Sequence, residues 1–357
     1  MSKWLLHIAC AFAMALAFTG CALVDDDMSD CEADHKIDYE LRLVTNMTTE
    51  LQTQLSTQVE LKAVAASLQK TLSGIFTDYA HDVNLSFYDV KEDSIRLHHE
   101  SHIMDANQSS YTLYIPVRKY MHVAVANLEP MNQDGTEAEK MIFLVNDEKC
   151  HSSRIHQPVN STDNIIKSHN TGVFTARLPM DIKEGMDQEF DVKLYMANCA
   201  SALALDTLGS GIKDIRIFAS GFANSFNLAD SSYVFSFTPK VQAEEVKVAD
   251  GQFVCYYAVT FPSKDVTTKT VIETDDPYVS AISAEKLWDY TVYTTVADGS
   301  ITETVLSVKL PLRPGQFKLI RAKVQPDGSV APRDKDPYVG ASVTLQWNEL
   351  PGWDVDF

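Results

Sequence analysis

Apolar and polar residues alternate along short stretches that cover much of the chain. In the first half this period of two occurs at residues 37–43, 83–88, 110–115 and 120–126. Alternation of this kind predicts strands with one buried and one solvent-facing side. Residues 132–168 are mostly polar apart from 141–145, and we expect them to be largely loop.

The second half carries a denser series of strand patterns. They occupy residues 172–178, 190–196, 212–218, 290–296, 301–308, 317–324 and 341–347. Asp298-Gly299 separates two of them and predicts a tight hairpin, because Asp-Gly supplies the positive φ that such a turn requires. Pro326-Asp327-Gly328 predicts another turn. Many short strands rich in threonine, valine and tyrosine predict a mainly β chain of sandwich domains with one or two short helices.

One segment in the first half changes to a helical period. Its apolar residues recur three or four positions apart, at Leu61, Val64, Leu68, Leu72 and Ile75. Thr57 and Glu60 stand in the order of a capping box at its start, and Gly74 and Asp78 mark its end. We expect a second, short helix around residues 200–208.

The N-terminus has the features of an export signal. Lys3 precedes an apolar run, residues 4–18, which is too short to span a bilayer comfortably. The run ends in Phe18-Thr19-Gly20-Cys21, which resembles the bacterial lipobox although leucine is more usual where Phe18 stands. The resemblance implies that Cys21 carries a diacylglyceryl group and becomes the new N-terminus. The alternative is an ordinary cleaved signal peptide with an incidental cysteine.

An acidic cluster follows Cys21. It consists of Asp25, Asp26, Asp27, Asp30 and Glu32. The cluster resembles the surface-export signal of Bacteroidetes lipoproteins, which places them on the outer leaflet of the outer membrane. A solvated, flexible tether is the alternative interpretation.

Length and charge limit the remaining possibilities. With 357 residues we expect two domains, at 36–168 and 169–357, after a signal peptide at 1–20 and a lipidated tether at 21–35. Removal of the signal takes away only Lys3 among the charged residues, so the formal net charge goes from −19 to −20. This balance argues against nucleic-acid binding, which requires basic surface.

Four cysteines remain beyond Cys21 in the mature chain: Cys31, Cys150, Cys199 and Cys255. Four cysteines in an exported chain allow three disulfide connectivities. Pairing within each domain, Cys31 with Cys150 and Cys199 with Cys255, is the simplest hypothesis. Cys255 could equally be a small buried core residue, and the spacings do not match a zinc site.

The one histidine-rich stretch is residues 97–102, with His98, His99 and His102 around Glu100. The order of a zinc peptidase motif is absent. We expect a solvated hairpin here, with an incidental metal contact by His98 and His102 as the alternative. We find no catalytic constellation and expect neither enzymatic activity nor a cofactor.

Several of these features together resemble the FimB family of fimbrial subunits from Bacteroidales. The first is the lipobox with the acidic cluster after it and Asp30-Cys31. The second is the strand and helix that lead into the strand at residues 83–89. The third and fourth are the segment at residues 120–127 and the C-terminal pattern at residues 339–347. That ending, Val-Gly-Ala-Ser-Val-Thr-Leu-Gln-Trp, is similar to the family pattern Val-Gly-x-Ser-Val-Thr-Leu-x-Trp. Gln346 stands where the family usually has an acidic residue.

The resemblance implies two tandem transthyretin-like β-sandwiches. It further implies a surface-exposed outer-membrane lipoprotein that anchors or assists a fimbrium. Its partners would be fimbrial subunits, joined by β-strand exchange along an exposed sheet edge.

A surface glycan-binding lipoprotein of a polysaccharide-uptake system is the alternative function. Such a protein stacks sugars on exposed aromatic side chains. Trp288, Trp347 and Trp353 are the tryptophans of the mature chain. A coplanar exposed pair would favour sugar binding, whereas packed tryptophans would favour the fimbrial role.

Overall fold

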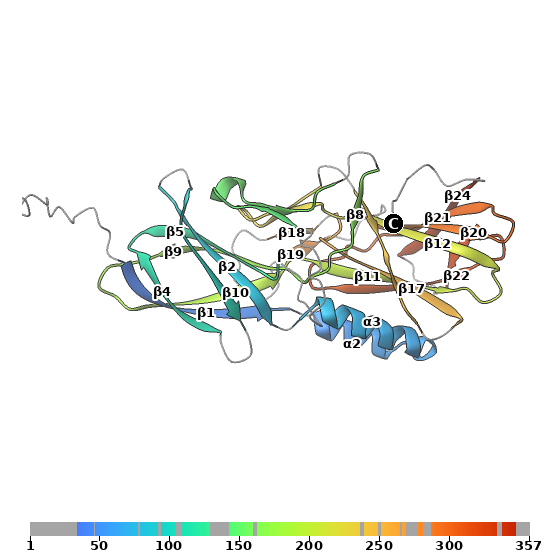
Figure 1. The fold of residues 1–357 in the computed structure, drawn as a ribbon, viewed down its shortest axis with the longest axis horizontal. Coiled ribbons are helices and arrows are strands. Elements are labelled where there is room, and N and C mark those ends of the chain that lie inside the picture. Colours follow the sequence, from blue (N-terminus) through green and yellow to red (C-terminus); the bar gives the residue numbers. More distant parts are fainter. Residues whose placement is uncertain are drawn as a thin grey trace, which may run out of the picture.

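The molecule is elongated, with a curved sheet at one end and a β-sandwich at the other (Figure 1). The computed structural model describes residues 34–347 with gaps at 46, 78, 92–93, 105–108, 129–142, 160–162, 236–238, 249–250, 265, 269–277, 281–286 and 334–337. At His81, 266–268, 278–280 and 344–347 it describes the backbone only. Within these residues, no helix is both long and apolar enough to cross a membrane.

The curved sheet has seven strands. In spatial order they are β3 (Arg96–Met104), β2 (Ala80–Asp89), β5 (Lys119–Ala126), β9 (Phe174–Asp181), β10 (Gln188–Met196), β1 (Asp34–Val44) and β4 (Ser110–Pro116). β1 and β10 run parallel, whereas the other neighbours are antiparallel. The sheet curls until its two edge strands meet, since the Tyr111 hydroxyl of β4 donates to the Ile103 carbonyl of β3.

The sandwich at the other end consists of two sheets. The five-stranded sheet has the order β16 (Glu244–Val246), β17 (Phe253–Thr260), β11 (Cys199–Asp206), β22 (Phe317–Val324) and β23 (Val330–Pro332). The six-stranded sheet has the order β24 (Val339–Trp347), β21 (Ile301–Val308), β20 (Trp288–Val296), β12 (Ile212–Ser220), β15 (Lys240–Gln242) and β8 (Ile165–Lys167). Leu203, Trp288 and Leu306 are among the side chains that fill the core between them. The mainly β, sandwich-based fold predicted from the alternation is confirmed.

Two helices from the first third of the chain cover the outer face of the five-stranded sheet (Figure 1). They are α2 (Met47–Ser56) and α3 (Lys62–Ile75), joined by the short 3₁₀ helix η2 (Val59–Leu61). Buried residues of both helices share one core with Ala200, Ala202 and Ala204 of β11. These small side chains let the helices approach the sheet closely.

The helix predicted at 200–208 is wrong, because this segment is the central strand β11. All eight residues of β11 are buried. The strand alternates alanines toward the helices with larger residues such as Leu203 and Leu205 toward the sandwich core. A strand buried on both faces is apolar throughout and lacks the alternation that identified the other strands.

The predicted helix is present as α3, but its capping box is absent. Leu61 occupies the N-cap position without a side-chain hydrogen bond. The Thr57 hydroxyl donates to the Gln54 carbonyl of the preceding helix at 3.0 Å. Because α2 ends at Ser56, the Thr57 hydroxyl bonds to the C-terminal turn of α2 and does not cap the N-terminus of α3.

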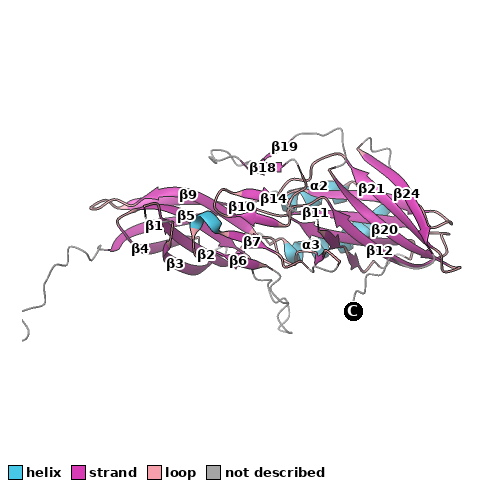
Figure 2. Cartoon of the chain, turned by 90° about the horizontal axis from the view of Figure 1, so that it is seen from above, coloured by secondary structure: helices cyan, strands magenta, loops and turns pink. Residues whose placement is uncertain are grey.

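A four-stranded sheet lies beside the curved sheet. Its order is β14 (Ser232–Val234), β13 (Ser225–Asn227), β7 (Arg154–His156) and β6 (Leu144–Asn146). A 3₁₀ turn, η3 (Cys150–Ser152), connects β6 to β7. Figure 2 shows the hairpin of β18 (Val266–Thr268) and β19 (Tyr278–Ser280) standing above the body of the molecule.

The sheets do not divide the chain at the expected boundary of 168 and 169. β9 and β10 follow this boundary, yet they pair with β5 and β1 in the curved sheet. β8 and the helices precede it, yet they belong with the C-terminal sandwich. The chain therefore passes repeatedly between its two ends, and the sequence-based division is corrected accordingly.

Candidate functional site

Strand β24 forms one edge of the C-terminal sandwich and has no strand on its outer side among the described residues. It pairs with β21 in a register that runs from Val339 opposite Val308 to Trp347 opposite Ile301. β24 is the last strand of the six-stranded sheet. Its residues from Gly340 to Val343 are exposed, and Val343 retains 55% of its accessible surface. The strand is therefore held mainly by backbone hydrogen bonds to one neighbour, while its outer edge can pair with another chain.

A second edge, on β22, is closed by a side chain. β23 pairs with β22 only from Ala322 to Val324. Before that point the Gln54 amide of α2 donates to the Phe317 carbonyl and accepts from the Leu319 N–H, the latter at 3.2 Å. A residue of a parallel neighbouring strand would make the same two bonds, so Gln54 takes the place of a strand on this edge.

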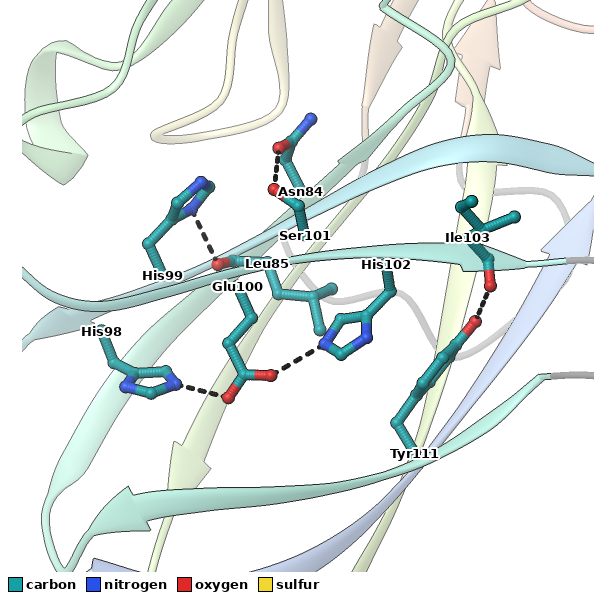
Figure 3. Close-up of polar contacts among 9 residues, drawn as sticks. All are labelled: Asn84, Leu85, His98, His99, Glu100, Ser101, His102, Ile103 and Tyr111. Atoms are coloured by element: carbon teal, nitrogen blue, oxygen red, sulfur yellow. Dashed lines mark hydrogen bonds and ion pairs between the residues drawn. The ribbon is translucent and has the colours of Figure 1, made fainter.

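The histidine-rich stretch lies on the edge strand β3, which forms a hairpin with β2 (Figure 3). His98, Glu100 and His102 project from the same side of β3, and their side chains are half-buried. The Nε2 atom of His98 lies 2.6 Å from Glu100 Oε1, and that of His102 lies 2.8 Å from Oε2. His99 projects from the other side, where its Nδ1 lies 3.1 Å from the Leu85 carbonyl.

This arrangement is a hydrogen-bonded triplet. Each imidazole is directed at a different oxygen of the Glu100 carboxylate (Figure 3). His102 also contacts the Tyr111 ring at a centroid distance of 4.4 Å. The described residues contain no group of three or more histidine, cysteine or acidic side chains placed to hold a metal ion. The triplet supports the seam where β3 and β4 meet.

The tryptophans do not form an exposed aromatic platform in the described part of the chain. Trp288 is buried in the sandwich core, where its Nε1 donates to the Leu310 carbonyl at 2.9 Å. The side chain of Trp347 and all of Trp353 lie outside the described residues. The exposed aromatic side chains that are described, Tyr79, Tyr114 and Tyr338, belong to separate segments.

The three described cysteines do not pair with one another. Cys150, Cys199 and Cys255 are buried free thiols. Cys255 faces Ala204 across the β11–β17 ladder, whereas Cys199 faces Thr260 at the opposite end of that ladder. The hypothesis of a Cys199–Cys255 disulfide is therefore wrong, because the two residues lie five positions apart along paired strands. Cys21 and Cys31 lie outside the described residues.

Comparison with known proteins identifies the fold. No protein-family model matches the chain, and no curated protein matches it in sequence. A candidate adhesin from Bacteroides ovatus shares 13% identity with a TM-score of 0.51, over 87% of this chain and 96% of that chain. The chain has the fold of this adhesin.

Two further solved structures align over similar lengths. A second candidate adhesin from Bacteroides ovatus gives a TM-score of 0.50 at 8% identity, over 87% of this chain and 95% of that one. The fimbrial anchor protein Mfa2 from Porphyromonas gingivalis gives 0.40 at 10% identity, over 88% and 97%. The two candidate adhesins from Bacteroides ovatus share this fold across nearly their whole lengths.

Proposed function

We propose that this protein is a surface-exposed lipoprotein of the outer membrane that anchors or assists a fimbrium. Its role is structural and not catalytic. The open edge of β24 is the observation that carries the proposal. An exposed edge strand offers a row of backbone donors and acceptors to an incoming chain, and strand addition uses these groups for affinity.

The direction of the chain through the molecule supports this role. β1 begins at the end remote from the sandwich and leads directly into α2, which packs on the sandwich (Figure 1). Cys21 precedes Asp34 by 13 residues, a length that spans at most about 45 Å. A lipid on Cys21 thus places the curved sheet nearer the membrane and presents the sandwich, with β24, outward.

The fold adds independent support. Proteins described as candidate adhesins in Bacteroides ovatus have the same architecture. Fimbrial subunits are the expected partners, and β24 is the strand we assign to the exchange. In that step β24 adds to a sheet of the neighbouring subunit, or pairs with its strand, through backbone hydrogen bonds.

Deletion of the gene tests the fimbrial role. We expect the deletion strain to shed fimbriae into the medium or to carry overlong fimbriae, as judged by electron microscopy and by sedimentation of the culture supernatant. Complementation with the full chain should restore attachment. Complementation with a chain that ends before residue 339, and therefore lacks β24, should not.

The glycan-binding alternative predicts a different outcome. Unchanged fimbriae in the deletion strain, together with impaired growth on a polysaccharide, would contradict the fimbrial role. If the chain lacking β24 still holds fimbriae on the cells, the fimbrial role stands, but β24 is not the strand that is exchanged.

A further inference from the structure

The C-terminal sandwich has another strand edge without a neighbouring strand, on β12. One side of β12 pairs with β20 from Ile212 to Ser220. The other side pairs with β15 only at Phe218 and Ala219, followed by a bond from the Ala243 N–H to the Ile217 carbonyl. The chain then crosses to the opposite sheet as β16, which pairs with β17. In the described part of the chain, this crossing leaves the first half of β12 without a strand beside it.

A groove of about 420 Å³ occupies the space that the crossing opens. Residues 214–218 of β12 form one wall, residues 242–245 form the other, and Tyr256 lies between them. Because backbone groups of a strand alternate between its two sides, Ile215 directs its N–H and C=O the same way as Ile217, into the groove. The Tyr256 hydroxyl donates to the Ile215 carbonyl at 3.4 Å, a long bond that an incoming backbone N–H can replace.

The groove is acidic. Asp214, Glu244 and Glu245 line it, against the single guanidinium of Arg216, whose Nε lies 3.4 Å from Asp214. The Glu244 carboxylate accepts a hydrogen bond from the Tyr257 hydroxyl at 2.6 Å, so Asp214 and Glu245 are the carboxylates that the groove offers to a ligand. Burial raises the pKa of Tyr256 to about 12, and the charges of Glu245 and Asp214 add to that rise. The negative charges of Asp214 and Glu245 therefore both raise the pKa of the hydroxyl that is bonded to the Ile215 carbonyl.

Apolar surface is present beside these charges. Ile212, Ile215 and Tyr256 are half-buried residues that pack against the core between the two sheets. Alternate side chains of an added strand would complete their burial. The edge of β22 differs from this one. There the Gln54 amide makes the two hydrogen bonds that a neighbouring strand would make. At Ile215 the carbonyl accepts one hydrogen bond, from the Tyr256 hydroxyl.

We propose that the β12 groove accepts an extended segment of a neighbouring subunit in which basic and apolar side chains alternate. The segment pairs with β12 around Ile215, covers Ile215 and Tyr256 with its apolar residues, and places its basic residues against Asp214 and Glu245. This inference rests on the proposed function, since a neighbouring subunit supplies the segment. The groove is a junction distinct from β24.

Peptide binding to the mature chain tests the groove. The probe is an acetylated and amidated peptide of about seven residues in which lysine and valine alternate, and calorimetry at physiological salt measures binding. We expect saturable one-to-one binding. N-methylation of the backbone amides along one edge of the peptide should weaken it about tenfold for each bond lost. A peptide with glutamate in place of lysine should not bind.

Substitutions in the protein test whether the peptide binds in the β12 groove. Glu245→Lys should weaken binding of the lysine peptide by about fivefold, because it reverses an exposed charge at the groove. Glu189→Lys, on exposed surface of the curved sheet, makes the same change in net charge and should leave binding unaltered. Ile215→Pro should abolish binding by removing the backbone N–H, and circular dichroism verifies that this variant folds.

Three results would overturn the proposal: absence of saturable binding, equal binding of the N-methylated peptide, or equal weakening by Glu189→Lys and Glu245→Lys. Loss of fimbriae from the deletion strain does not depend on this groove. Peptide binding with unchanged fimbriae in that strain would therefore contradict the fimbrial role alone. Failure of peptide binding with shed fimbriae would contradict the groove alone.

Discussion

At the scale of single residues, the curved sheet is held by a buried pair between Tyr39 of β1 and His122 of β5. The Tyr39 Oη lies 2.5 Å from His122 Nε2, and His122 Nδ1 lies 3.1 Å from the Ser86 carbonyl. A carbonyl only accepts, so Nδ1 carries the proton and Nε2 accepts from the hydroxyl. Burial lowers the pKa of His122 to about 3, and the imidazole is neutral in the folded protein.

This depressed pKa predicts how stability depends on pH. Between pH 6.5 and about 3 the unfolded chain protonates His122 and the folded chain does not, so the free energy of unfolding decreases as pH falls through this range. His122→Gln should reduce that slope by about 1.4 kcal/mol per pH unit. Urea denaturation across the range measures it. His151→Gln, at an exposed position, is the control, and equal slopes for His122→Gln and the wild type would contradict the prediction.

Gln54 gives a second prediction at this scale. Gln54→Ala should lower the free energy of unfolding by about 1–3 kcal/mol, because it leaves the Phe317 carbonyl and the Leu319 N–H without their partner. Gln52→Ala, an exposed change on the same helix, should have little effect. Chemical denaturation compares the two variants, and similar losses would argue against a strand-like role for Gln54.

At the scale of elements, the contact between β11 and the helices depends on small side chains. Ala202→Leu should lower stability by about 1–3 kcal/mol, because the added methyl groups meet a packed interface. We also expect faster hydrogen exchange throughout residues 47–75. Leu203→Ala, on the opposite face of the same strand, should lower stability by about 2–5 kcal/mol without exposing the helices. Unchanged exchange in Ala202→Leu would contradict this packing.

Sequence patterns predict strands in which apolar and polar residues alternate. β1, β5, β20 and β21 alternate clearly, and the Asp298-Gly299 hairpin forms as predicted, with φ of 92° at Gly299. The sequence of β11 predicts a helix, because burial of both faces of this strand removes the alternation. α2 was missed because only Met47, Leu51 and Leu55 mark its buried side. Their spacing of four residues is a signal that could have identified it.

The spatial order of the strands was beyond these local patterns. β1 pairs with β10 across about 150 residues of sequence, and nothing within either strand specifies that partner. The same holds for the edges of β12 and β22. The open side of β12 arises from the crossing at Ala243, and the closed side of β22 arises from a glutamine on a distant helix. Both depend on tertiary packing.

At the scale of the whole molecule, the proposed lipid attachment at Cys21 gives a prediction. Cys21→Ala should release the protein from the membrane fraction, because each buried methylene of the lost acyl chains contributes about 0.8 kcal/mol of binding. Cell fractionation and immunoblotting measure the change. Cys31→Ala is the matched control and should remain membrane-bound. Retention of Cys21→Ala in the membrane fraction would refute lipid attachment at this residue.

The parallel pairing of β1 with β10 has a mechanical consequence. In the proposed role, tension between a membrane and a fibre would enter the described body through the start of β1 and leave through the sandwich, so it would act along the strand. β1 and β10 are paired at eight positions, from Ile37 opposite Gln188 to Val44 opposite Tyr195. The hydrogen bonds between the two strands lie across the direction of the pull. A pull therefore shears all of them together and does not peel them apart one by one. Such a sheet resists stretching best in the direction in which flow would load a tethered filament.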